Sequence, residues 1–137
     1  MRQTISINTH PQDVYKQQDI LTASPIDVIV MLYDALKKSI ILGRRGIQKN
    51  DANTAHKNLI KAQEIVTELV NSLDMSYQIS EELLTIYDII LRSLEDANLR
   101  KDEKSLDTII EIVDSLREAW REISASNKGS LHLEEES

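Results

Sequence analysis

Three histidines, His10, His56 and His132, are the side chains of this chain best suited to metal, acid–base or phosphoryl chemistry. A di-metal site in a helical bundle needs a Glu three residues before a His on two helices, and none of the three has one. The chain has no cysteine, which excludes disulfides, thiolate metal sites and cysteine nucleophiles. We therefore expect no metal and no cofactor.

Nucleophilic catalysis finds no support in the residue pattern either. Ser, His and Asp all occur, but no Gly-x-Ser-x-Gly turn accompanies them, and no Gly-rich phosphate loop is present. The sequence therefore predicts no catalytic residues and a protein that is not an enzyme.

His56 leaves one chemical alternative open, a phosphotransfer module. It lies roughly 60° from the apolar face of its predicted helix, and Lys57 follows it. The surrounding sequence AHKNLIKAQ lacks the glycine that lets such a histidine stand clear for a docking domain. Phosphotransfer through His56 is an alternative to a binding function.

The elements that hold these residues are predicted to be helices. The 137 residues include only three Gly and two Pro, and 41% are apolar. This composition and the apolar period predict an all-α domain, an antiparallel up-down four-helix bundle. We expect a 1–23 N-terminal cap segment, irregular with one short helical turn, the bundle over 24–125, and a mobile acidic tail over 126–137. The helices are expected at about 25–49, 52–73, 80–101 and 103–125.

Capping residues mark the predicted helix starts. Ser24 followed by Pro25 and Asp27 resembles a capping box, Ser80 is expected to cap the third helix, and Asp102 the fourth. Short connections between these helices force neighbours to run antiparallel.

The first helix carries more apolar surface than one core contact can bury. One stripe runs from Ile29 through Leu36 to Ile47, and a second stripe beside it consists of Val28, Met31, Ala35 and Leu42. Gly43 and Gly46 weaken the helix by about 1 kcal/mol each and are expected to permit a close helix crossing. We predict that the second stripe contacts a partner.

The charge distribution limits what that partner can be. Residues 1–50 hold seven Lys or Arg against four Asp, a charge of +3, whereas residues 51–137 hold nine against nineteen acids, a charge of −10. An acidic body disfavours nucleic acid. The apolar runs are too short for membrane insertion, and the N-terminus shows no signal pattern, so we expect a cytoplasmic protein.

Five blocks of the sequence together resemble the FliS family of flagellin-specific secretion chaperones. The first block is YKQQDILTASPIDVIVMLYDAL, from Tyr15 to Leu36. The others are Leu59 to Gln63, Leu73-Asp74 with Tyr87-Asp88, Ala97-Asn98-Leu99 with Asp102, and Ala119-Trp120. The chain departs from the family pattern at Ile26-Asp27, at Ala35 and at Arg92-Ser93.

This resemblance implies a client and a mode of binding. FliS-like chaperones bind the disordered C-terminal segment of flagellin, prevent its premature polymerisation and hold it for the flagellar type III export apparatus. The resemblance implies that flagellin lies in apolar grooves between helices. It also implies that Tyr15, Ile20 and Leu21 form a removable N-terminal cover, and that other flagellar export or assembly components are further partners.

Taken together, the residues and the resemblance give a set of candidate partner-binding positions. These are Tyr15, Val28, Met31, Leu32, Ala35, Leu42, Ile65, Leu69, Leu91 and Ile112. Tyr33 and Tyr87 are expected to pack in the core with their hydroxyls at its rim. The alternative to a flagellin-binding function is a structural bundle that forms a homodimer and buries the same stripe against a second copy.

Overall fold

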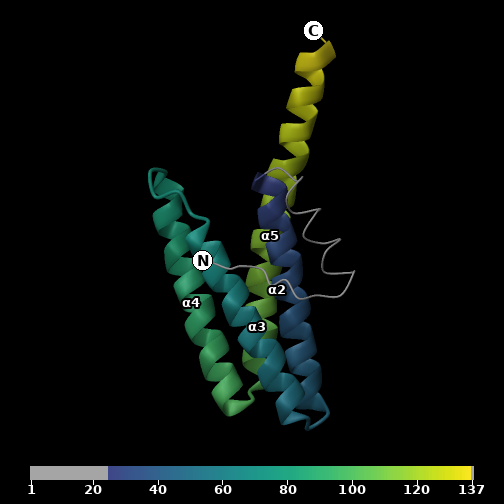
Figure 1. Ribbon diagram of the computed structural model, residues 1–137, viewed down its shortest axis with the longest axis vertical. Helices are drawn as coiled ribbons and strands as arrows, with labels where there is room; N and C mark the ends of the chain where they lie inside the picture. Colours follow the sequence, from purple (N-terminus) through teal and green to yellow (C-terminus); the bar gives the residue numbers. More distant parts are fainter. Residues whose placement is uncertain (1–24, 137) are drawn as a thin grey trace, which may run out of the picture.

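The computed structural model describes the backbone of residues 25–136 and the side chains of residues 25–126. Within residues 25–136 the chain forms four α-helices and no strand. They are α2 (Pro25–Gln48), α3 (Ala52–Asn71), α4 (Gln78–Arg100) and α5 (Glu103–Glu136) (Figure 1). The predicted all-α four-helix bundle is confirmed. The expected N-terminal segment, with Tyr15, Ile20, Leu21 and the Ser24 cap, lies outside the described residues.

The helices form a ring in which α2 contacts α3 and α5, and α4 contacts the same two helices. The connections are short, so successive helices run antiparallel. The turns after α2 and after α4 lie at one end of the bundle, and the connection between α3 and α4 lies at the other (Figure 1). We call the first the closed end and the second the open end.

The core is drawn from the apolar faces of all four helices. Each face follows helical spacing, as in Leu83, Ile90, Leu94 and Ala97 of α4. The largest fully buried side chains include Tyr33, Leu36, Ile40, Leu59, Leu69, Tyr87, Leu106 and Val113. The first apolar stripe predicted for α2, from Ile29 through Leu36 to Ile47, is thus confirmed as its core face at Leu36.

Three helix starts, at Pro25, Ala52 and Glu103, agree with the sequence, and the start of α4 differs. Asp102 accepts hydrogen bonds from the Ser105 hydroxyl (2.7 Å) and the Lys104 amide (3.1 Å), as predicted for the cap of α5. The prediction for Ser80 is wrong, because α4 begins at Gln78. The Ser80 hydroxyl is buried and donates to the Asp74 carbonyl at 2.6 Å instead, which closes the α3–α4 connection.

Helix α5 extends further than the sequence predicted, to Glu136 rather than to about residue 125. The apolar period stops near Ile123, whereas the helix continues beyond it. A single glycine, Gly129, destabilises a helix by only about 1 kcal/mol and does not end α5. The end of the apolar period therefore marks the point at which α5 stops packing against the other helices. None of the helices among the described residues is long and apolar enough to cross a membrane.

Two glycines let α2 and α3 approach closely near the closed end, as the sequence predicted. A Cβ atom at Gly46 would lie 2.6 Å from the Ala55 backbone nitrogen, and a Cβ at Gly43 would lie 2.7 Å from Leu59 Cδ2. The first contact is with backbone and the second with a side chain. Because these two glycines have no side chain, α2 can pack directly against α3 at the closed end.

On its other flank α2 is joined to α5 by a ladder of polar contacts. Every step of three, four or seven residues along α2 is matched by an equal step backwards along α5, as antiparallel helices require. The pairs are Gln48–Glu103 (2.7 Å), Arg44–Asp107 (2.6 Å), Lys37–Asp114 (2.7 Å), Asp34–Arg117, and Asp27–Ser124 (2.5 Å). We call these pairs the α2–α5 ladder.

Candidate partner-binding site

The second apolar stripe of α2 lies on the outward side of the helix, between the flank that meets α3 and the flank that carries the α2–α5 ladder. Val28, Met31 and Leu42 are each partly exposed and lie outside the contiguous core cluster. Ala35 is also partly exposed, but it packs against that cluster. Three of the four predicted positions therefore offer apolar surface at which a partner helix could pack.

The other candidates on α2 and α3 are more deeply placed. Leu32 is partly buried against the core, Ile65 is 8% exposed, and Leu69 is fully buried. Both α2 and α4 pack against α3, so Ile65 is buried as well, although it lies off the face that Leu69 shares with Leu59 and Val66. In this conformation Leu69 has no surface to offer, and its role as a partner contact is still a prediction.

The remaining candidates are divided between the core margin and the undescribed terminus. Leu91 of α4 and Ile112 of α5 are partly buried and pack against the core cluster. Tyr15, Ile20 and Leu21, the proposed N-terminal cover, lie outside the described residues. The structure therefore gathers Val28, Met31, Ala35 and Leu42 on one face and places Leu91 and Ile112 on other helices.

Sequence reasoning missed a set of exposed apolar residues at the open end of the bundle. Met75 and Tyr77 in the α3–α4 connection, Ile79 of α4 and Ile123 of α5 are each more than two-fifths exposed. Ile79 precedes Ser80, the predicted cap, and so lies outside the predicted helix, whereas α4 begins at Gln78. The spacing of Ile79 from Leu83 and Ile86 is the signal that could have placed it on the core face.

The core contains one buried polar pair, formed by two of the chain's four tyrosines. The Tyr33 and Tyr87 hydroxyls lie 2.6 Å apart, and the rings are 6.4 Å apart between centroids. Both side chains are at most 1% exposed, so our prediction of hydroxyls at the rim is wrong. Burial raises the pKa of both phenols above the usual value, which keeps them protonated and able to share this hydrogen bond.

A second polar cluster ties α3 to α4 at the closed end. Lys101 Nζ donates to the Asn98 side-chain oxygen at 2.6 Å, and the Asn98 amide lies 3.0 Å from His56 Nδ1. Because an ammonium can only donate, Asn98 Oδ1 faces Lys101 and its NH₂ group faces His56. His56 Nδ1 must then accept, so the neutral ring carries its proton on Nε2. His56 therefore has a structural partner, and its phosphotransfer role stays untested.

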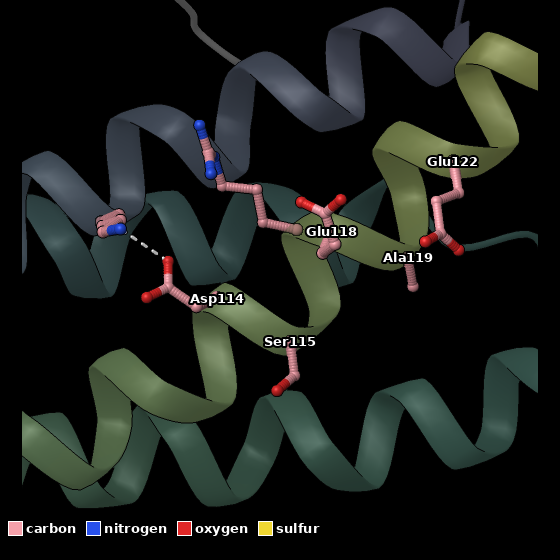
Figure 2. A pocket seen from close by; sticks show the side chains of 7 residues that line it. Asp114, Ser115, Glu118, Ala119 and Glu122 are labelled. Atoms are coloured by element: carbon pink, nitrogen blue, oxygen red, sulfur yellow. Dashed lines mark ion pairs between the residues drawn. The ribbon is translucent and has the colours of Figure 1, made fainter.

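One shallow hollow lies beside that cluster, and another lies on the outer face of α5. The one beside His56 has a volume of ≈ 290 Å³ and includes Gln63 and Glu95. The other, of ≈ 670 Å³, lies over α5 (Figure 2). Figure 2 shows the ion pair between Asp114 and Lys37, and it shows Ser115 and Ala119 on the side of α5 where α4 lies. Glu118 and Glu122 are exposed. Both are open, charged depressions.

No group of three or more His, Cys, Asp or Glu among the described residues is arranged to hold a metal ion. What the described residues do offer is apolar surface, on the outer side of α2 and at the open end. The arrangement is suited to binding a polypeptide.

Comparisons with known proteins agree on one family. The model of the family described as flagellar protein FliS matches residues 7–127 of this chain. The flagellar secretion chaperone FliS of Bacillus subtilis (strain 168) is 32% identical over 123 residues, which cover 90% of this chain and 92% of that protein. The protein of the same name from Salmonella typhimurium is 30% identical over 108 residues, 77% of this chain and 80% of that protein.

Proposed function

We propose that this chain, which belongs to the FliS family of flagellar proteins, is a cytoplasmic chaperone that binds flagellin. In this proposal the disordered C-terminal segment of flagellin folds into amphipathic helices on the chaperone. Binding then prevents premature polymerisation and keeps the subunit ready for the flagellar type III export apparatus. The proposal assigns the chain no catalytic activity.

The observation that carries the proposal is the apolar surface of α2. Val28, Met31 and Leu42 are partly exposed on one side of a helix whose other sides are already occupied by α3, α5 and the core. A helix with exposed apolar side chains can still bury them against a partner. Each Å² of apolar area buried in this way contributes about 25 cal/mol to binding. Methionine adapts its shape to different contacts, which suits a surface that must fit a flagellin helix.

A client that folds on binding also explains why the surface is spread along the helix. Ordering a disordered segment costs free energy, which many modest contacts over a large area can offset. Val28 and Leu42 are fourteen residues apart, about 21 Å along the helix axis, the length of four turns of a bound helix. The N-terminal residues Tyr15, Ile20 and Leu21 are proposed to cover part of this surface when flagellin is absent.

Titration calorimetry with the C-terminal segment of the flagellin encoded in the same genome tests the proposal. We expect a one-to-one complex with submicromolar affinity, or about −8 kcal/mol or more favourable. The variants Met31→Ser and Leu42→Ser should each weaken binding by about tenfold, as expected when one apolar side chain loses its contact.

The matched control is Leu99→Ser, at a residue of α4 that is 84% exposed and far along the chain from the α2 stripe. It should leave the affinity within about twofold. A titration without detectable heat at tens of micromolar would contradict the function. Tight binding that neither α2 variant weakens would instead keep the function and reject the site.

A homodimeric structural bundle would use the same stripe in another way. Light scattering across a range of protein concentrations separates the two functions. We expect a concentration-independent monomer, because the stripe must stay free for flagellin. A tight dimer that Met31→Ser dissociates would favour the structural alternative.

A further inference from the structure

The open end of the bundle exposes residues that occupy core positions of their helices. Ile79 is in register with Leu83, Ile86 and Ile90 on the inward face of α4, yet it is 56% exposed. On α5, Ile123 is in register with Leu116 and Trp120, and it is 43% exposed. Their sequence positions are those of buried residues, so their exposure shows that the core is not closed there.

Burial falls along both helices in the same direction. On α4 the inward residues change from fully buried Leu94, through Leu83 at 8% exposed, to Ile79 at 56% exposed. On α5 they change from fully buried Val113, through partly buried Leu116, to exposed Ile123. Figure 1 shows the cause, since α4 diverges from α5 towards the α3–α4 connection. The two apolar faces are therefore too far apart at the open end to bury each other.

Ile89 extends this surface along α4. It is 52% exposed and lies on the same flank as Ile86 and Ile79, the flank towards α5. We call Ile79, Ile86, Ile89, Leu116 and Ile123 the α4–α5 apolar surface. It is a different surface from the α2 stripe, because it is made by the two helices that complete the ring opposite the α2–α3 contact.

Acidic side chains border the α4–α5 apolar surface. Glu82 is exposed and lies three residues after Ile79, on the same flank of α4. Glu122 is exposed on the outer face of α5, three residues after Ala119, whose side chain lies on the side towards α4 (Figure 2). An apolar strip with carboxylates along its borders is complementary to a helix with an apolar stripe and Lys or Arg beside it.

We propose that the α4–α5 apolar surface docks a second polypeptide partner, a basic amphipathic helix that packs between the diverging halves of α4 and α5. The partner's apolar stripe covers Ile79, Ile89 and Ile123, and its cations pair with Glu82 and Glu122. This helix would close the core at the open end as a fifth member of the bundle. The site does not depend on flagellin binding to α2.

A synthetic helix with this chemistry is the probe for the site. It has about 18 residues, or about 27 Å of helix, with Leu and Ala on one stripe and Lys on its borders. A second peptide carries Glu in place of every Lys. The chain has a single tryptophan, Trp120, which is partly buried beside Leu116 and Ile123. Its fluorescence reports binding of peptides that lack Trp and Tyr.

We expect the lysine peptide to change the Trp120 emission and to bind at least about tenfold more tightly than the glutamate peptide at low salt. Ile79→Ser and Ile89→Ser should each weaken it by about fivefold to tenfold, and Glu122→Lys by a similar factor. The matched controls are Leu99→Ser, at an exposed apolar residue of the closed end, and Glu64→Lys, at an exposed acid of α3. Both should stay within about twofold.

Three outcomes overturn the proposal. The first is equal affinity for both peptides, or an affinity that Ile79→Ser does not change. The second is a concentration-dependent dimer that Ile79→Ser dissociates, which would assign the surface to a second copy. The third is tighter peptide binding in the Ile20→Ser, Leu21→Ser double variant, which would assign it to the chain's own N-terminal segment. Met31→Ser should leave the peptide affinity unchanged, so this test fails or succeeds independently of flagellin binding.

Discussion

At the closed end of the bundle, Gly46 brings α2 onto the backbone of α3, the His56–Asn98–Lys101 cluster ties α3 to α4, and Arg44 pairs with Asp107 of α5. At the open end, Ile79 and Ile123 occupy core positions of their helices and are nevertheless about half exposed. The closed end is thus fixed by small residues and specific polar pairs, whereas the open end keeps unburied apolar surface.

This difference separates what holds the fold from what is available for binding. Close backbone packing and satisfied polar groups define one arrangement of the helices, since any other leaves a clash or a buried polar group unpaired. Apolar area that is not buried within the chain contributes little to folding, and it can contribute to association instead. Substitutions should therefore be costly for stability at the closed end and costly for binding at the open end.

The largest effect is expected from one face of α4, on which Ile90 and Ile79 occupy equivalent helical positions. Ile90 is 1% exposed, so Ile90→Ala should lower the free energy of unfolding by about 3 kcal/mol. Ile79→Ala, at an exposed site, should lower it by about 0.5 kcal/mol or less. Urea unfolding followed by circular dichroism measures both. Equal losses would mean that the open end is closed in solution.

The glycines of α2 give the next largest effect. At Gly46 an added Cβ meets the Ala55 backbone, so Gly46→Ala should destabilise the protein by about 2 kcal/mol despite the better helix propensity of alanine. At Gly43 it meets the end of the Leu59 side chain, which can change rotamer, so Gly43→Ala should cost about 1 kcal/mol or less. The same urea experiment compares them. If Gly43→Ala were the more costly, the backbone approach would not be what fixes α2 against α3.

The sequence predicted this architecture well because its evidence is local. Helical spacing identified the apolar stripe of α2 that contains Leu36, and Asp102 was recognisable as a cap from its position alone. The second stripe of α2 was also visible, since it follows from the period of one helix.

What could not be predicted depends on how helices meet. Ile65 is buried because two helices pack against α3, and neither neighbour is visible in the local pattern. The Tyr33–Tyr87 pair joins residues 54 positions apart, from two of the blocks that carry the family resemblance. The divergence of α4 from α5 is likewise a property of the assembled bundle, so the exposure of Ile79 and Ile123 appears only in the structure.

The buried tyrosine pair links α2 to α4 across the core and gives a smaller effect. Tyr33→Phe or Tyr87→Phe leaves one buried hydroxyl without its partner and should cost about 1 to 2 kcal/mol. The double variant removes both hydroxyls, so it should cost less than the sum of the two single variants. Costs that simply add would show that each hydroxyl is satisfied independently of the other.

The same pair predicts a pH dependence. Burial raises the pKa of Tyr33 and Tyr87 in the folded state above the value of about 10 that unfolded tyrosine has. Their contribution to stability is therefore fully present below pH 10 and is lost as the pH rises towards the folded-state pKa. Urea midpoints measured from pH 8 to pH 11 should fall above pH 10. They should fall less in the Tyr33→Phe, Tyr87→Phe double variant.

The smallest effect is expected from the α2–α5 ladder, although it spans the helices from the closed end to the open end. The Arg44 and Asp107 side chains are 30% and 54% exposed, so Asp107→Lys should cost only about 0.5 to 1 kcal/mol, and less at high salt. Arg44→Asp combined with Asp107→Lys should recover most of it. Asp88→Lys, in an exposed pair within α4, is the control and should cost about 0.3 kcal/mol.

Such small energies still select one register, because slipping α2 by one residue turns its side chains by about 100° and separates every pair of the ladder at once. If reversing Asp107 alone cost nothing and the double reversal gained nothing, the ladder would be excluded as the feature that sets the register. The glycine contact with α3 would then be the structural feature at the closed end that holds α2 in place.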